Sequence, residues 1–276
     1  MTTTAPRPGW LVPVEPTGPG TFATSVPPDW WGFSGAHGGL LGGLAVEAAT
    51  SAFDSGMSPQ VLDLRLLARV DDTTLVIEVA PLHRGRSLAV ADVVALQGGR
   101  VVASATVTFA APVPAPGADG VAGGGLDRQG PAAPEVPTAD RCAPFAPPAE
   151  LVPFAGHLSI RPAAGPLPLS GADQAEMTAW VGIEPDHPVT PGIAVVLTDA
   201  LPPGIYPLLT APVAVPTVQL SVHLHTDLAA APVDGPLLVR QRNVSTRRGW
   251  SIDETDMWSR TGRLIGQGRQ LRRVLP

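Results

Sequence analysis

The sequence predicts an α+β protein made of two similar units in tandem, each a helix followed by antiparallel strands. Two glycine-entered apolar segments, residues 35–53 and 190–202, align so that Gly39 falls on Gly192. After each segment the chain changes to the alternating pattern of β-strands and contains a related hairpin. With 276 residues, the chain is long enough for two such units.

The first unit is expected to begin with an irregular arm. Residues 1–28 are rich in proline and threonine and contain few helix formers, with a short strand expected at 20–24. A helix is expected over 35–53, because apolar residues recur there at helical spacing. Gly42 and Gly43 each cost roughly 1 kcal/mol of helix stability relative to alanine. We expect them to let the helix lie close to the sheet and to leave a tunnel beside it.

The strands of both units follow from alternating hydrophobicity and turn residues. In the first unit they are expected at 61–70, 74–80, 86–97 and 100–109, with Gly98-Gly99 as a two-residue hairpin turn. In the second unit we expect strands at 154–161, 177–183, 217–226, 236–246, 250–259 and 263–274, and a helix at 191–201. The turn at 84–87 aligns with the turn at 248–251, which supports a duplication.

Proline, alanine and glycine dominate residues 111–151, and no periodicity is visible there. This composition indicates a long, partly mobile linker. The predicted organisation is therefore an N-terminal unit with its arm over residues 1–110, a linker over 111–151, and a C-terminal unit over 152–276.

Charge and cysteine content exclude several classes of protein. The net charge of −6 argues against nucleic-acid binding. Residues 240–276 carry nine arginines and three acids, which indicates either a site for a phosphate-bearing ligand or an outward arginine face on a strand. Cys142 is the single cysteine, so an intramolecular disulfide and a thiolate metal cluster are excluded. No signal pattern or membrane-length apolar run is visible, and the expected location is cytoplasmic.

The order of the elements and the segment LHRGRSLAVADVVALQGGRVVASATVTF resemble the type-II acyl-coenzyme A thioesterase family, over residues 30–109 and 152–274. This resemblance implies a tandem double hotdog, in which a curved antiparallel sheet wraps one central helix per unit. It also implies an acyl-CoA thioesterase of lipid metabolism that needs no cofactor. By analogy, exposed sheet edges imply a homo-oligomer. The acyl chain length does not follow from the sequence.

The resemblance further implies that an Asp, Thr and Gln trio holds the hydrolytic water. The matching positions are Asp199, Thr217 and Gln270. Gln267 lies near, but an odd separation on a strand places it on the opposite face from Gln270. On a buried helix the Asp199 carboxylate is costly unless it is hydrogen-bonded, and Thr217 and Gln270 are suitable donors. The alternative is that Asp199 caps the helix or faces solvent.

The oxyanion side of the site is expected from the first unit. The amides of Gly38 and Gly39 lie at a helix N-terminus, which favours negative charge. His37 is expected either to bind the thioester carbonyl or to cap the helix. The mirror site pairs Gly192 with Val46, which cannot act as a base, so that site is expected to be inactive.

Other candidate sites are weaker. Arg247, Arg248 and Arg260 are candidates for the phosphates of coenzyme A. His223 and His225 share a strand face, but no third metal ligand is evident, so no metal is expected. The leading function is hydrolysis of an acyl thioester to coenzyme A and a carboxylic acid. The alternatives are another acyl-thioester enzyme, such as a hydratase using an Asp–His pair with His37, and a non-catalytic acyl-CoA-binding protein.

Overall fold

The computed structural model describes residues 11–33, 35–53, 56–111 and 130–275. The first ten residues of the predicted arm, residues 54–55 after the first helix and residues 112–129 of the predicted linker lie outside this set. No described helix combines the length and the hydropathy needed to span a membrane.

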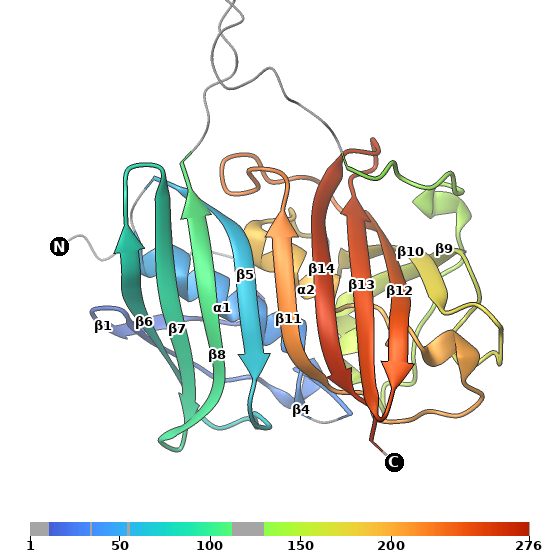
Figure 1. Cartoon of the computed structure of the whole chain (residues 1–276), viewed down its shortest axis with the longest axis horizontal. Coiled ribbons are helices and arrows are strands. Elements are labelled where there is room, and N and C mark those ends of the chain that lie inside the picture. Colours follow the sequence, from blue (N-terminus) through green and yellow to red (C-terminus); the bar gives the residue numbers. More distant parts are fainter. Residues whose placement is uncertain (1–10, 34, 54–55, 112–129, 276) are drawn as a thin grey trace, which may run out of the picture.

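The chain forms one twelve-stranded antiparallel sheet with two α-helices on the same face (Figure 1). In sheet order the strands are β1 (Glu15–Gly18), β2 (Thr21–Thr24), β6 (Leu75–Arg84), β7 (Leu88–Gln97), β8 (Arg100–Ala110), β5 (Ser58–Leu66), β11 (Thr217–Leu224), β14 (Leu264–Arg273), β13 (Trp250–Trp258), β12 (Leu237–Arg247), β10 (Glu176–Ile183) and β9 (Leu158–Ala164). The helices are α1 (Gly38–Ala52) and α2 (Pro191–Thr198). Short elements complete the fold: β3 (Trp31–Gly32), β4 (Gly35–Ala36), η1 (Pro28–Trp30), η2 (Ala139–Arg141), η3 (Pro153–His157) and η4 (Tyr206–Leu208).

The strand order repeats with opposite direction on the two sides of the β5–β11 pair. The series β5, β8, β7, β6 on one side corresponds to β11, β14, β13, β12 on the other. At the junction Leu64 lies opposite Leu220 and Leu62 lies opposite Val222, and all four side chains are buried beneath the helices. The predicted α+β architecture of two tandem helix-and-sheet units is thereby confirmed, and their sheets are continuous.

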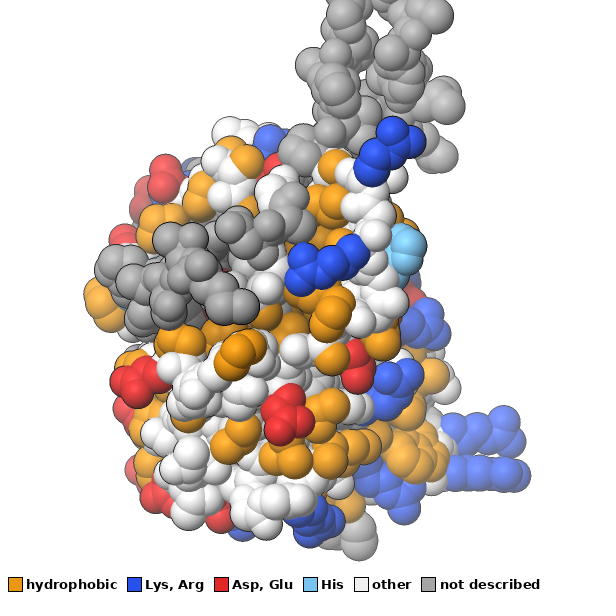
Figure 2. Space-filling model, turned by 90° about the vertical axis from the view of Figure 1, so that its left-hand side faces the viewer, with side chains coloured by type: hydrophobic (Ala, Val, Ile, Leu, Met, Phe, Trp, Pro, Cys, Tyr) orange, Lys and Arg blue, Asp and Glu red, His pale blue; other side chains and the backbone are white. Residues whose placement is uncertain are grey.

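The arm contributes more structure than expected. The strand anticipated at 20–24 is present as β2, and β1 pairs with it to form an additional edge hairpin beside β6. The end of the molecule nearest β1 and β6 shows charged side chains of both signs among hydrophobic ones (Figure 2). The homo-oligomer expected from the sheet edges stays a prediction.

Residues 131–142 of the predicted linker pack against the outer face of the C-terminal half-sheet. The indole N–H of Trp180 donates to Pro137 O at 2.8 Å, and that of Trp258 donates to Pro131 O at 2.8 Å. These indoles, with Cys142, form a separate small apolar cluster. The segment therefore shields two tryptophans that point away from the helices. The division at residues 110 and 152 stays a prediction.

Gly42 allows the two helices to pack closely. A Cβ at Gly42 would lie 2.8 Å from Val195 Cγ1 on α2 and 3.0 Å from Leu62 Cδ2 on β5. The expected tunnel beside the helix is therefore not open at this glycine, because neighbouring side chains occupy the space. The void between α1 and the sheet measures only about 10 Å³, roughly the room that one water molecule needs.

We predict that Gly42→Ala destabilises the protein, although alanine is the better helix former. The added methyl group overlaps Val195, and overpacking of a core costs about 1–3 kcal/mol. Urea unfolding followed by circular dichroism measures the change. Gly156→Ala is the matched control, because a Cβ there meets no atom within 4 Å. Equal unfolding midpoints for the two variants would contradict the prediction.

Candidate active site

Asp199 lies at the junction of the two units, with its carboxylate surrounded by hydrogen-bond donors. It is the C-cap of α2, one residue beyond Thr198, so the expected helix at 191–201 ends earlier than predicted. Its Oδ1 accepts from Gln270 Nε2 at 2.5 Å and from the Thr217 hydroxyl at 3.5 Å. Its Oδ2 accepts from the amide of Gly39 at 2.9 Å. The structure therefore brings the three predicted residues of the trio together, with donors from both units.

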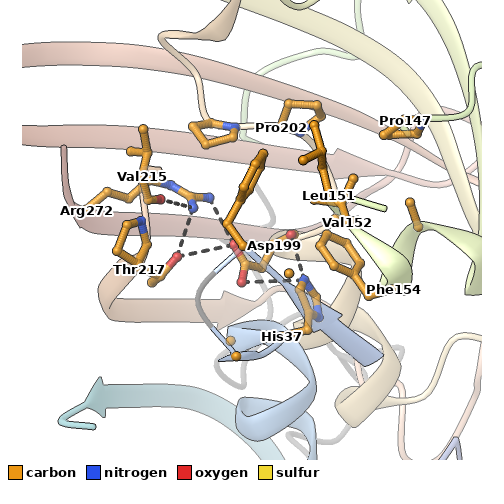
Figure 3. A pocket seen from close by; sticks show the side chains of 18 of the residues that line it. His37, Pro147, Leu151, Val152, Phe154, Asp199, Pro202, Val215, Thr217 and Arg272 are labelled. Carbon is orange, nitrogen blue, oxygen red and sulfur yellow. Dashed lines mark hydrogen bonds and ion pairs between the residues drawn. The ribbon is translucent and has the colours of Figure 1, made fainter. Parts of the chain in front are cut away.

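Arg272 is a member of this cluster that the sequence analysis missed. Its Nη2 donates to Asp199 Oδ1 at 2.9 Å, and its Nη1 donates to the Thr217 hydroxyl at 2.9 Å (Figure 3). The same Nη2 also donates to Gln270 Oε1 at 2.7 Å. One guanidinium thus contacts all three residues of the trio. The available signal was its position on β14, two residues after Gln270, because residues two apart on a strand share a face.

The guanidinium of Arg272 also joins Asp199 to a second buried carboxylate. Its Nε lies 2.9 Å from Asp253 Oδ2 on β13. Asp253 in turn accepts hydrogen bonds from the Gly204 amide at 3.0 Å and from Asn243 Nδ2 at 2.9 Å. All three charged side chains are at most 6% exposed. Two buried anions therefore share one buried cation.

The environment of Asp199 keeps its carboxyl group ionised. Burial by itself would raise the pKa of Asp199, but the charge of Arg272, the nearby His37 ring and the hydrogen bonds from Gln270 and Gly39 outweigh it. The net result is a pKa below the usual value for an aspartate. The group is therefore a carboxylate at neutral pH, held in a fixed orientation.

His37 caps α1 and contacts Asp199. Its Nδ1 accepts from the amide of Leu40 at 3.2 Å, so the proton of the neutral ring lies on Nε2. That Nε2 lies 2.9 Å from Asp199 O and 3.5 Å from Asp199 Oδ2. Burial lowers the pKa of His37 against the opposing influence of Asp199, which favours the neutral ring. Of the two expected roles, the cap is present in the structure.

Gly38 and Gly39 let the N-terminus of α1 approach this carboxylate. A Cβ at Gly38 would lie 2.9 Å from Asp199 Oδ2, and one at Gly39 would lie 2.9 Å from both Asp199 Cβ and Val196 O. Side chains at these positions would separate the units. The Gly39 amide donates its hydrogen bond to Asp199. Gly38 is the first residue of α1, so its N–H has no intrahelical partner.

The carboxylate opens onto a cavity of about 600 Å³. Asp199, Thr217, Arg272, His37 and Gly38 line it, but Gln270 does not; Gln270 lies behind the carboxylate and is only 1% exposed. The remaining wall is mainly apolar and comes from the segment 145–155, the end of β5 and the loops after α2 (Figure 3). Its apolar side chains include Phe145, Pro147, Leu151, Phe154, Leu201 and Val215. The cavity suits an uncharged apolar group placed next to a fixed carboxylate.

The three arginines proposed for coenzyme A do not form one group. Arg247 and Arg248 lie at the turn between β12 and β13, whereas Arg260 follows the other end of β13. The nine residues of β13 separate them by roughly 30 Å at 3.4 Å per residue. The turn that contains Arg247 and Arg248 lies beside the cavity. Its Gly249 O accepts from the Val274 amide at 2.9 Å, and the next residue, Leu275, lines the cavity.

Other arginines of the basic C-terminal region are paired with acids on the outer face of the sheet. Arg240 binds Asp256 at 2.7 Å, while Arg242 and Arg269 bind Glu254 at 2.6 and 2.7 Å. For these three residues the structure has the outward arginine face that the sequence left open as an alternative. Their charge is largely compensated by their partners.

His223 on β11 and His225, just after this strand, lie away from the site. His223 is exposed, with its Nε2 3.4 Å from the Ser221 hydroxyl, and His225 lies 3.1 Å from Gln267. Gln267 also donates to Asp256, on the outer face opposite to Gln270. Within the described residues, no group of three metal-ligating side chains is found.

The helix contact is asymmetric about the pseudo-twofold axis. Asp199 meets the entrance of α1, and Val46 is the residue that corresponds to Asp199 when Gly39 is aligned with Gly192. The entrance of α2 is capped by the Thr190 hydroxyl and continues through Pro191. Val46 is buried and apolar, so the mirror position lacks an acid.

Comparisons with known proteins assign both halves of the chain. A family model described as the acyl-CoA thioesterase N-terminal domain matches residues 27–110, and one described as the acyl-CoA thioesterase C-terminal domain matches residues 133–274. Uncharacterized proteins of Mycobacterium bovis and Mycobacterium tuberculosis are each 30% identical over 264 residues, covering 86% of this chain and 85% of theirs.

Solved structures share the architecture. A protein of unknown function with a hot dog fold from Alicyclobacillus acidocaldarius superposes with a TM-score of 0.85 at 22% identity, covering 96% of both chains. An acyl-CoA thioesterase II from Mycobacterium marinum superposes with a TM-score of 0.72 at 18% identity, covering 95% of this chain and 96% of its own. These similarities confirm the double-hotdog fold.

We predict that Arg272→Met lowers the free energy of unfolding at pH 7 by about 3–5 kcal/mol, because it leaves two buried carboxylates without their cation. The loss should shrink as the pH is lowered. Without Arg272 the pKa of Asp199 rises, so the variant can relieve the repulsion by protonating Asp199. Urea unfolding at pH 7 and pH 5 measures both effects.

Arg269→Met is the control for this variant. Arg269 lies on the same strand, but it is 58% exposed and pairs with Glu254 at the surface, where an ion pair contributes about 0–1 kcal/mol. Similar losses in the two variants, or a loss for Arg272→Met that does not change with pH, would show that the buried cluster is not the source of the effect.

Proposed function

Because this chain belongs to the acyl-CoA thioesterase family, we propose that it hydrolyses an acyl-CoA thioester to a free carboxylic acid and coenzyme A at Asp199. The observation that carries this proposal is the placement of the Asp199 carboxylate. It is ionised, buried and fixed by donors from both units, and it faces an apolar cavity of about 600 Å³ beside a helix N-terminus.

In the proposed reaction Asp199 acts as the general base. A water bound between Asp199 and the Thr217 hydroxyl attacks the carbonyl carbon of the thioester and gives its proton to the carboxylate. The 3.5 Å separation of Thr217 from Asp199 Oδ1 is long for a hydroxyl donor, so this hydroxyl is free to turn toward a water. Gln270 holds the carboxylate from behind and does not itself meet the water.

The oxyanion that forms during attack is stabilised by the N-terminus of α1. The Gly38 amide is the donor proposed for this role, because Gly38 lines the cavity and its N–H lies at the positive end of the 15-residue helix. When the tetrahedral intermediate collapses, the C–S bond breaks and the proton held by Asp199 passes to the departing sulfur. The acid and the thiol leave, and the carboxylate is restored.

Arg272 serves as a positioning residue in this scheme. It binds Asp199, Thr217 and Gln270 together, and its charge keeps Asp199 ionised. The same charge weakens Asp199 as a base, because a lower pKa means a lower affinity for the proton of water. The arrangement therefore lowers the basicity of Asp199 but keeps its carboxylate ionised and in a fixed orientation.

In the bound substrate, the coenzyme A portion would extend out of the cavity toward arginines at the surface. Arg247 and Arg248 lie in the turn beside the cavity, and Arg69 lines the cavity as an exposed side chain. We propose these residues as the contacts for the coenzyme phosphates. Arg260 is too distant from that turn to act with them.

Hydration of an enoyl thioester is the second candidate function. The observation that favours it is the contact between the His37 imidazole and the Asp199 carboxylate, which come from different units and line the same cavity. Adding an enoyl-CoA separates the two functions. A hydrolase releases the free thiol and leaves the double-bond absorbance unchanged, whereas a hydratase lowers that absorbance and releases no thiol.

We predict that Asp199→Asn lowers kcat for release of coenzyme A by about 10²- to 10⁴-fold, the usual contribution of a general base. The measurement is the appearance of free thiol from a saturated acyl-CoA. Asp63→Asn is the matched control, because its carboxylate binds the Ser221 hydroxyl on the outer face of the sheet. Full activity in Asp199→Asn would overturn the proposal and favour an acyl-binding protein with incidental turnover.

We also predict a pH profile of kcat/KM that stays flat through neutral pH and falls only below the usual carboxyl pKa of about 4. Arg272→Gln should move this acid limb to higher pH, because removing the cation raises the pKa of Asp199. In this variant, His37 and Asp253 are the other ionisable groups near Asp199. An unshifted acid limb, with folding verified by circular dichroism at each pH, would exclude Asp199 as the titrating base.

A further inference from the structure

We infer that Leu41 separates the active-site cavity from the space beside α1 and thereby restricts this site to acyl groups compact enough to fit within the cavity. This inference rests on the proposed function, since it assigns the class of acyl thioester that the site accepts. Leu41 becomes a residue that determines specificity.

Leu41 lies between two spaces of very different size. It lines the cavity of about 600 Å³ that contains Asp199, and it also lines the void of about 10 Å³ between α1 and the sheet. It is one helical turn beyond Gly38, and it is buried. An acyl chain entering past the Gly38 amide therefore meets the Leu41 side chain before it reaches the void.

The void beyond Leu41 is suited to hydrocarbon but has no room for it. Its lining is mainly aliphatic and includes Leu44, Leu64, Leu75, Ile77 and Val93. Burial of a methylene group in such surroundings would be favourable, but about 10 Å³ accommodates no more than a single water-sized group. Removing the Leu41 side chain would join this apolar space to the cavity.

The other side of α1 offers no alternative route at its central glycine. The position of a Cβ at Gly42 is already in contact with Val195 and Leu62. The acyl group must therefore stay in the large cavity, between the N-terminus of α1 and the apolar wall formed by Phe145, Leu151 and Phe154. The predicted substrates are acyl-CoA esters with a short or compact uncharged acyl group, in preference to long straight chains.

The test compares kcat/KM across a series of saturated straight-chain acyl-CoA esters for wild type, Leu41→Ala and Leu44→Ala. Wild type should prefer the shorter esters. Leu41→Ala should raise the ratio of long-chain to short-chain kcat/KM, by about fourfold for each methylene group that enters the new space. Leu44→Ala removes the same atoms from the same helix, but Leu44 lines only the void, so its ratio should match that of wild type.

Two results would overturn the inference: wild type that hydrolyses long and short chains equally well, or equal ratios in Leu41→Ala and Leu44→Ala. If Leu41→Ala does not fold, Leu41→Val makes the same comparison with a smaller change in volume. The proposed function fails separately, if wild type releases thiol from none of the esters. In that case calorimetric Kd values for the same series and variants decide the inference, since the shape of the cavity limits binding as well as turnover.

Discussion

The candidate active site depends on the ion pairs that the guanidinium of Arg272 makes with Asp199 and Asp253. The side chains of Asp199, at the end of α2, and Asp253, on β13, are both buried, so their charges would be strongly destabilising without a shared cation. The same guanidinium fixes Thr217 and Gln270. Stability and chemistry are thus coupled, because the group that makes the carboxylate tolerable also sets its orientation and its pKa.

The absence of side chains at the entrance of α1 is the second constraint. Asp199 accepts the Gly39 amide only because Gly38 and Gly39 leave room for its carboxylate, and the close approach of α2 depends on Gly42 in the same way. Each half of the duplicated chain therefore supplies what the other lacks. The first supplies an open helix entrance, the second supplies the acid, and Val46 leaves the mirror position without one.

Much of this arrangement could be predicted from the sequence. Alternating and helical periodicities located the strands and helices, and the resemblance selected Asp199, Thr217 and Gln270. The rule that placed Gln270 and Gln267 on opposite faces also applies to Arg272, so this residue was within reach of the sequence analysis. Whether the space at Gly42 is open or filled could not be predicted from the sequence. A missing side chain can leave a tunnel or allow a close contact, and the position of Val195 decides between them.

The position of the cavity follows from these same contacts. Close packing of α1 against α2 and β5 fills the space at the centre of the double hotdog, and what remains beside α1 is about 10 Å³. The cavity of about 600 Å³ lies where the pseudo-symmetry is broken, between the entrance of α1 and the segment 145–155 that precedes β9. Residues 145–151 of that segment belong to the region predicted as a linker, and the segment supplies aromatic and proline side chains to the wall. The tight helix contact that places the carboxylate thus also leaves the room for a ligand outside the repeated core, against a wall to which the segment 145–155 contributes.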